Sequence, residues 1–181
     1  DLSALFQEEF AGMKVVVCAN LPYYITSPVI MALLEKRLPI SAITVMVQKE
    51  AADRLCAPMP SRACGAVTAA VRYYSEPRML FPVSRGSFTP PPNVDSAVIR
   101  LDIRSNLPLD GEEEAQFFAL VRGAFSQRRK TLQNNFSSSL GLTKPQVAAA
   151  LEEIGVKPTA RAEELSMEQL LALREALSPS L

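Results

Sequence analysis

The chain has 181 residues, 48% of them hydrophobic, which is enough to build the core of one domain or of two small ones. Its 19 basic and 19 acidic residues balance, so overall charge gives no general attraction to nucleic acid. Histidine is absent. Nucleophile activation by Ser-His-Asp or Cys-His groups is therefore excluded, and an enzyme of this sequence works by positioning, carboxylates, cofactors or backbone groups.

Membrane insertion and metal binding find no support in the sequence. No apolar run approaches the roughly 20 residues that a membrane-spanning helix needs, and a signal-peptide pattern is lacking, so we expect a cytoplasmic protein without membrane contact. Cys18, Cys56 and Cys64 have no C-x-x-C spacing. With no histidine to complete a ligand set, we expect no metal site and three buried or half-buried free thiols.

The first part of the chain alternates between strands and helices. Residues 14–19 (KVVVCA) form an almost continuous apolar run, typical of a strand buried on both faces of a parallel sheet, and residues 42–48 (AITVMVQ) predict a second strand. Ser27 and Pro28 predict the N-cap and first position of a helix over 29–35. A short helix follows at 49–55, and this order predicts an α/β fold.

Proline-rich turns divide the next part of the chain. Residues 66–74 (AVTAAVRYY), 79–83 (MLFPV) and 97–103 (AVIRLDI) are predicted as strands, separated by the turns SEP and SFTPPPNVDS. The connections leave no room for crossover helices of normal length. We therefore expect antiparallel pairing at the edge of the sheet.

From about residue 107 the pattern becomes helical. Apolar residues at helical spacing are Phe117, Leu120, Val121, Ala124 and Phe125. Thr143–Gln146 and Ser166–Gln169 each match a capping box, and Gly155 is placed to end the helix that Thr143 begins. The sequence therefore predicts an α/β domain over 1–106 and a small all-helical domain over 107–181.

Basic residues gather in the helical part. No acidic residue occurs from Ala115 to Leu151, whereas this stretch contains Arg122, Arg128, Arg129, Lys130 and Lys144. If the first helix continues through residue 129, Arg122, Ser126 and Arg129 share one face, opposite the apolar stripe. Such a face suits phosphate binding, or it is an ordinary solvated surface.

The sequence Asn20-Leu21-Pro22-Tyr23 follows the first strand, at the carboxyl end where open α/β sheets place their ligands. The Asn20 side-chain carbonyl and the next backbone carbonyl can accept hydrogen bonds from a planar amine. Pro22 stiffens the turn, and Tyr23 offers a face on which a base can stack. This arrangement suits the exocyclic amine of adenine, whose nitrogen becomes nucleophilic when two acceptors hold it tetrahedrally. The alternative is an ordinary turn between strand and helix.

Four segments, in this order, resemble the ribosomal RNA adenine dimethyltransferase family: NLPYYITSPVI (20–30), VMVQKEAADRL (45–55), RGSFTPPPNVDSAVIRL (85–101) and FSQRRKTLQNNF (125–136). The similarity runs from about residue 13 to residue 175. Leucine at position 21 resembles the kasugamycin-resistance branch, which modifies small-subunit RNA, whereas the erythromycin-resistance branch more often has isoleucine. The resemblance implies the C-terminal half of a Rossmann-like, S-adenosylmethionine-dependent methyltransferase domain, a mixed sheet with an antiparallel edge, followed by an RNA-binding helical domain.

The resemblance also implies a role for individual residues. Asn20 and the Leu21 carbonyl would hold the target amine, Pro22 would fix the turn, and Tyr23 would stack on the flipped base. Phe88 would be a second aromatic residue of the pocket, or else a core residue under the proline loop. Arg128, Arg129 and Lys130 would contact RNA phosphates, and we expect the same of Arg122 from the basic residues described above. Tyr24 is expected only to pack beside the turn.

One part of the family pattern is missing. Family members begin with a glycine-rich loop and with acidic residues that hold the methyl donor, but the seven glycines of this chain form no such loop. We therefore expect that about half of the nucleotide-binding domain is absent, that Asn20 alone represents the donor site, and that S-adenosylmethionine binds weakly or not at all. The chain by itself is expected to be inactive. Its open strand at 14–19 favours self-association or partial unfolding.

The implied function is dimethylation of the exocyclic amines of two adjacent adenines in small-subunit (16S) ribosomal RNA during ribosome biogenesis, with the small ribosomal subunit as partner. One alternative is a ribosome-assembly or RNA-binding factor whose catalysis is dispensable. Another is a 23S ribosomal RNA adenine methyltransferase. Methylation of adenine in DNA fits the pocket chemistry but has no support from the other three segments.

Overall fold

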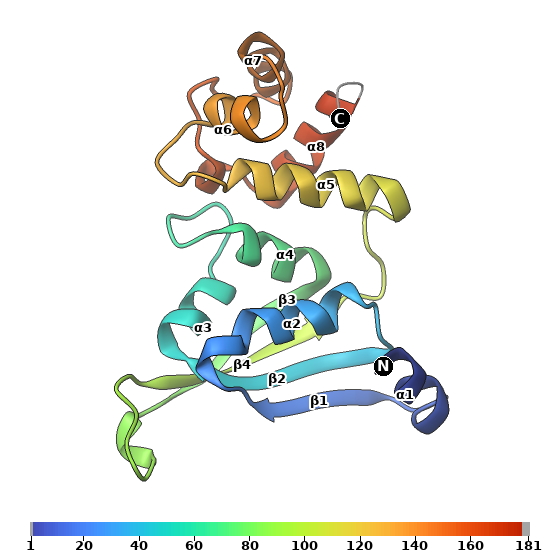
Figure 1. The fold of residues 1–181 in the computed structure, drawn as a ribbon, viewed down its shortest axis with the longest axis vertical. Helices are drawn as coiled ribbons and strands as arrows, with labels where there is room; N and C mark the ends of the chain where they lie inside the picture. The colour runs from blue at the N-terminus through green and yellow to red at the C-terminus, as the bar shows by residue number, and fades with distance from the viewer. Residues whose placement is uncertain (1, 179–181) are drawn as a thin grey trace. The chain divides into compact units, whose positions relative to one another are not determined.

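The computed structural model describes residues 2–178 and divides the chain into two compact units (Figure 1). The first unit contains the residues up to Cys56 together with Ala70–Asn106. The second contains Ala57–Ala69 and the residues from Leu107 onward. The division passes through helix α4 (Ala66–Tyr74), so a segment from the first half of the sequence belongs to the mainly C-terminal unit.

The first unit is built on a four-stranded mixed sheet with strand order β1-β2-β4-β3 (Figure 1). The strands are β1 (Val15–Asn20), β2 (Ile40–Gln48), β3 (Ser75–Val83) and β4 (Ser96–Ile103). β1 pairs with β2 in parallel, whereas β4 is antiparallel to both β2 and β3. The α/β fold and the antiparallel edge predicted from the sequence are therefore confirmed.

The core of this sheet lies on its two central strands. Ile43 and Val47 of β2 and Ile99 and Leu101 of β4 are fully buried. β1 differs from the prediction, because its residues alternate between half-buried and exposed instead of being buried on both faces. It forms an edge of the described sheet and has only β2 beside it, which leaves Val16 56% exposed.

The three cysteines follow this distribution of burial only in part. Cys64 is buried and Cys56 is half-buried, as predicted, but Cys18 is exposed because it lies on the outward-facing side of β1. Burial raises the pKa of the Cys56 thiol to about 11, an effect that outweighs the opposing influence of Arg72.

Short helices connect the strands of the first unit. They are α1 (Leu2–Glu9), η1 (Tyr23–Ile25), α2 (Thr26–Glu35) and α3 (Lys49–Leu55). The helix predicted over 49–55 is confirmed. The prediction that Ser27 caps the next helix is wrong, because the single turn η1 runs directly into α2 and makes Ile25 the residue before its first turn.

Two predicted elements in the middle of the chain have different structures. Residues 66–74, predicted as a strand, form helix α4. The Oγ1 atom of Thr68 accepts a hydrogen bond from the Gly65 N–H at 3.0 Å, which satisfies a backbone donor at the start of this helix. The SEP sequence, predicted as a turn, forms the first three residues of β3. Pro77 is tolerated there because β3 is an edge strand.

The second unit is helical from Gly111 onward. Its helices are α5 (Gly111–Ala124), α6 (Leu132–Ser139), α7 (Lys144–Glu153), η3 (Ala162–Glu164) and α8 (Met167–Leu177). Both predicted capping boxes are present, and Gly155 follows α7 with φ 71°, the left-handed conformation that ends many helices. α5 ends at Ala124, so the helical face predicted through Arg129 does not form.

Candidate functional site

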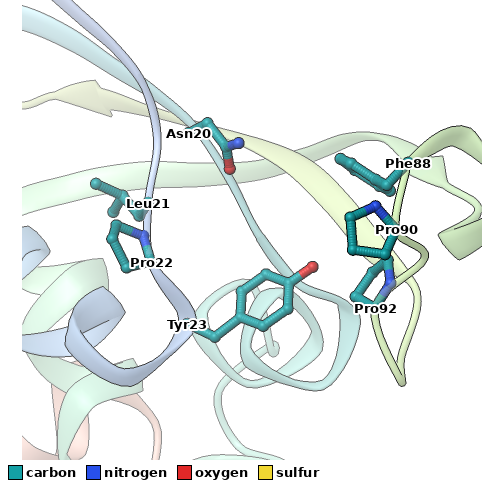
Figure 2. Close-up of a pocket in the computed structure, with 7 residues that line it drawn as sticks. All are labelled: Asn20, Leu21, Pro22, Tyr23, Phe88, Pro90 and Pro92. Carbon is teal, nitrogen blue, oxygen red and sulfur yellow. The ribbon is translucent and has the colours of Figure 1, made fainter.

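A pocket of about 330 Å³ lies where β1 ends (Figure 2). Its lining residues are Asn20, Leu21, Pro22, Tyr23, Phe88, Pro90 and Pro92. All of them belong to the first unit. The pocket therefore brings together two sequence segments, the turn after β1 and the proline-rich connection between β3 and β4. Both contain residues that we singled out from the sequence.

Asn20 and Leu21 are fixed by the end of the sheet. Asn20 is the last residue of β1 and lies opposite Met46 of β2. The Leu21 N–H donates to the Met46 carbonyl at 3.1 Å, which extends the strand pairing one residue beyond β1, and the Leu21 side chain is buried. Asn20 is exposed, and Figure 2 shows its amide directed toward the space between Tyr23 and Phe88.

The next two residues, Pro22 and Tyr23, also line the pocket. The Pro22 carbonyl accepts a hydrogen bond from the Ile25 N–H at 3.1 Å and another from the Thr26 hydroxyl at 3.4 Å, which closes the turn. The Tyr23 hydroxyl is hydrogen-bonded to the hydroxyl of Ser96 at 2.7 Å. Ser96 is fully buried, so this bond holds one end of the tyrosine ring in place.

Tyr24, the other tyrosine of this turn, has a different environment. Its side chain is 85% exposed, so the prediction that it only packs beside the turn is wrong. The adjacent tyrosines therefore have separate surroundings: Tyr23 lines the pocket, whereas Tyr24 faces solvent.

The opposite wall comes from the connection between β3 and β4, which includes the short turn η2 (Arg85–Ser87). Asp95 holds this connection: its carboxylate accepts from the Arg85 N–H at 2.8 Å, and its carbonyl accepts from the Lys49 N–H at 3.0 Å. Phe88 is half-buried and lines the pocket together with Pro90 and Pro92. It is therefore not a fully buried core residue.

These groups suit a planar ring that carries an amino group. Aromatic and proline surfaces form most of the lining, and the Asn20 amide supplies a hydrogen-bonding group at one side. No carboxylate is among the lining residues, so the pocket offers no acidic partner for ribose hydroxyls. The lining residues therefore suit a flat ring with an amino group better than a ribose that needs an acidic partner.

A second group of candidate residues follows helix α5 in the second unit. We call residues 125–131 the basic turn, because they contain Arg128, Arg129 and Lys130. All three are exposed, as is Arg122 on α5 itself. The guanidinium of Arg128 donates a hydrogen bond to the backbone carbonyl of Arg62, so one of its amino groups also connects two segments of this unit.

Sequence reasoning missed Ser96 and Asn135. Ser96 had no signal of its own, since a serine at the start of a strand is common. Asn135 lies in α6 between the buried residues Leu132 and Phe136, and a polar residue at a position with core spacing is the signal that could have identified it. Asn135 is 1% exposed, and its amide donates to the carbonyls of Ala124 and Gln127 at 2.6 and 3.2 Å.

Residues 2–178 lack two further kinds of feature. This part of the chain contains no cluster of three or more histidine, cysteine or acidic residues placed to hold a metal ion. None of its helices combines the length and the apolar character needed to cross a membrane.

The pocket and the basic turn both lie within a region that matches known proteins. The sequence model described as "Ribosomal RNA adenine dimethylase" matches residues 4–178. The ribosomal RNA small subunit methyltransferase A of Geobacillus thermodenitrificans is 48% identical over 99% of this chain and 62% of its own length. The protein of the same name from Lachnoclostridium phytofermentans is 44% identical over 98% of this chain and 62% of its own length. The chain thus spans less than two thirds of these relatives.

Solved structures show the same relationship. A dimethyladenosine transferase from Plasmodium falciparum superposes with a TM-score of 0.77 at 25% identity, over 97% of this chain and 70% of that one. The 23S ribosomal RNA methyltransferase ErmE superposes with a TM-score of 0.68 at 26% identity, over 94% of this chain and 70% of that one.

Proposed function

The chain belongs to the ribosomal RNA adenine dimethylase family, and from this premise we propose that it provides the target-base and RNA-binding parts of an adenine dimethyltransferase. The substrate in this proposal is the pair of adjacent adenines in small-subunit (16S) ribosomal RNA, and the partner is the small ribosomal subunit. The similarity to small subunit methyltransferases supports this choice. We also propose that the protein acts in the cytoplasm, together with its RNA substrate.

The observation that carries the proposal is the pocket itself. In this proposal the Asn20 side-chain carbonyl and the Leu21 carbonyl accept hydrogen bonds from the amine of a flipped adenine, while Tyr23 stacks on the ring. The bond between Tyr23 and Ser96 supports the stacking role, because it fixes the ring before a base arrives. Phe88 covers the base from the opposite wall. Two acceptors favour the tetrahedral amine, whose lone pair is available for attack.

The methyl donor of this family is S-adenosylmethionine, which supplies an electrophilic methyl group. The 181 residues contain no glycine-rich loop, and no carboxylate lines the pocket. Apart from Asn20, we therefore assign donor binding to polypeptide other than these residues. We expect calorimetric titration of S-adenosylmethionine into the 181-residue chain to give weak binding or none. Micromolar binding would show that the donor site is within the chain.

The RNA side of the proposal rests on Arg122 and the basic turn. Exposed guanidinium and ammonium groups bind phosphate oxygens, and the absence of acidic residues from Ala115 to Leu151 leaves these charges uncompensated by sequence neighbours. The overall charge of the chain is zero, so we propose that RNA contact is local to this surface.

The test compares catalysis with RNA binding in one variant. Asn20→Ala, made in the protein as its natural gene encodes it, is expected to lower methyl transfer to undermethylated small subunits by about 100-fold or more, because it removes an acceptor that positions the attacking amine. Affinity for the same subunits should change little, since Asn20 makes no phosphate contact in this proposal. Equal losses of methyl transfer and RNA affinity would contradict the role of Asn20.

The same assay distinguishes 16S from 23S ribosomal RNA as the substrate. Methylation of 23S ribosomal RNA is the second candidate, and the structural similarity to ErmE favours it. Supplying small and large subunits separately identifies the substrate from the RNA that is labelled. Labelling of the large-subunit RNA alone would replace our substrate assignment. The other alternative is an assembly factor with dispensable catalysis. In that case Asn20→Ala and the wild type should restore subunit maturation equally well in cells that lack the protein.

A further inference from the structure

The basic turn is fixed from inside the second unit by a buried side chain. Asn135 donates from one amide nitrogen to the Ala124 carbonyl, where α5 ends, and to the Gln127 carbonyl within the turn. The Ala124 carbonyl is at the last residue of α5, where helix carbonyls lack a partner within the helix, and Gln127 lies in the turn that follows. The Gln127 carbonyl also accepts from the Lys130 N–H at 3.0 Å, so Asn135 bonds to the carbonyl around which the turn closes.

Core packing alone does not explain why an asparagine occupies position 135. Its oxygen Oδ1 is buried and has no hydrogen-bond partner among the described residues. An apolar side chain would avoid that unpaired atom and would suit the neighbouring Leu132 and Phe136, which are fully buried. What an apolar side chain cannot do is donate to the two carbonyls that shape the basic turn.

A second contact connects the turn to a distant segment. The hydrogen bond from Arg128 to the Arg62 carbonyl joins the basic turn to Ala57–Ala69, which belongs to the same unit. Arg62 is exposed. The contact therefore brings the backbone of a fourth basic residue, from a different part of the sequence, next to the basic turn.

We propose that Asn135 and Arg128 act as positioning residues that hold the basic turn against Ala57–Ala69, so that Arg62, Arg129 and Lys130 form one preorganised phosphate-binding surface for RNA. This inference rests on the proposed function. It assigns Arg62 to the RNA contact and gives one amino group of Arg128 a structural role. Preorganisation matters because flexible basic side chains and loops lose conformational freedom when they bind.

The first test measures the shape of the turn without RNA. Asn135→Leu keeps an uncharged side chain of similar size but removes both hydrogen bonds. We expect trypsin to cleave this variant after Arg128, Arg129 and Lys130 severalfold faster than the wild type, as peptide mapping by mass spectrometry would show. Gln133→Leu is the matched control, since it exchanges an amide for the same alkyl group two residues earlier, on another side of α6.

The second test measures RNA binding by fluorescence anisotropy with a labelled RNA hairpin that has two adjacent adenines in its loop. The measured quantity is the slope of log Kd against log salt concentration. We expect Arg62→Ala, Arg129→Ala and Lys130→Ala each to reduce this slope by about 1. Asn135→Leu should reduce it as well, although it removes no charge, while Gln133→Leu should not. A merely structural role for Asn135 would lower thermal stability and leave this dependence unchanged in the folded variant.

The outcomes separate the inference from the proposed function. If the combined variant Arg129→Ala and Lys130→Ala binds the hairpin as the wild type does, the turn does not bind RNA and the proposed role of this surface is wrong. If that variant binds weakly but folded Asn135→Leu has the wild-type trypsin pattern and salt dependence, the inference alone is overturned. If Asn135→Leu does not fold, Asn135→Ser, which can donate only one hydrogen bond, is measured in the same way.

Discussion

At the scale of single residues, the tyrosine pair at the pocket shows how one hydrogen bond separates two otherwise equivalent side chains. Tyr23 and Tyr24 are adjacent in the sequence, but only Tyr23 bonds to the buried hydroxyl of Ser96. Position in the sequence did not reveal this difference, because Ser96 lies far away along the chain. The register of β4 against β2, which places Ser96 opposite Gln48, brings its hydroxyl within reach of Tyr23.

We expect Tyr23→Phe to lower the free energy of unfolding by about 1 kcal/mol, because it removes the hydroxyl that pairs with buried Ser96. Urea denaturation monitored by circular dichroism measures this change. Tyr24→Phe is the matched control, and its exposed hydroxyl should make the substitution nearly neutral. Equal effects of both substitutions would show that the hydrogen bond to Ser96 does not contribute to the free energy of unfolding.

Residue types at the site were more predictable than their surroundings. The sequence identified Asn20, Pro22, Tyr23 and Phe88, and the structure brings all four to one pocket. Their roles toward RNA stay predictions. Asn135 was not identified, because its polar side chain at a core-spaced position was the one signal, and the backbone carbonyls that it contacts cannot be read from the sequence.

At the scale of elements, the strands were predicted well where a hydrophobic run ends at a clear turn, as in β2 and β4. Helix α4 was mistaken for a strand because nearly every residue from Thr68 to Tyr74 is buried, so no exposed face reveals the helical period. Its valines and tyrosines favour strands, whereas tertiary packing selects the helix. β1 was correctly predicted as a strand, but its burial was not. Its apolar composition predicted burial on both faces, whereas this edge strand is only half-buried or exposed.

The contact between α5 and α6 supports a prediction about helix packing. A Cβ atom added to Gly123 would lie 2.8 Å from the Ser139 hydroxyl oxygen and 3.3 Å from Leu140. We expect Gly123→Ala to lower the free energy of unfolding by about 1–2 kcal/mol, although alanine favours helices more than glycine does. The loss should be smaller when Ser139 is also alanine, and thermal denaturation of the four variants in this cycle measures the coupling.

The pairing of β3 with β4 supports a prediction about pH. The hydrogen bond from Arg100, with help from Arg78, lowers the pKa of Asp102 below 3.8. Because the folded protein binds the proton less readily than the unfolded chain, this carboxylate stabilises the fold above pH 3.8 and loses that effect as pH falls through its lowered pKa. The contribution is small, since solvent screens these partly exposed groups.

The corresponding experiment compares the wild type with Asp102→Asn. Urea denaturation from pH 6 to about pH 2.5 should show the wild type more stable at the upper end, with the difference shrinking toward the acid end. A difference that stays constant across this range would mean that the charge of Asp102 does not contribute. In that case the effect of the substitution would come from altered packing or neutral hydrogen bonding.

At the scale of the whole molecule, the two edges of the sheet differ in how they resist pairing with another chain. β3 contains Pro77 and Pro82, which lack the backbone N–H that another strand would need. β1 contains no proline and exposes Val16 and Cys18. Open apolar strands of this kind favour self-association.

We therefore expect the 181-residue chain to associate as its concentration rises, with a larger weight-average mass in sedimentation equilibrium. Val16→Lys should shift this association to higher concentration, because an exposed lysine on an edge strand repels a second copy and must be desolvated when the strands pair. A wild-type chain that remains monomeric across the accessible concentrations would contradict this expectation.

The hydrogen bond that extends beyond β1 also provides a built-in reporter. The Leu21 N–H bonds to the Met46 carbonyl although Leu21 lies outside the strand, and its side chain is buried. Its amide hydrogen should therefore exchange with solvent deuterium only when the end of β1 separates from β2. Because this same separation would displace Asn20, the exchange rate of one amide reports how often the pocket opens, without any ligand or label.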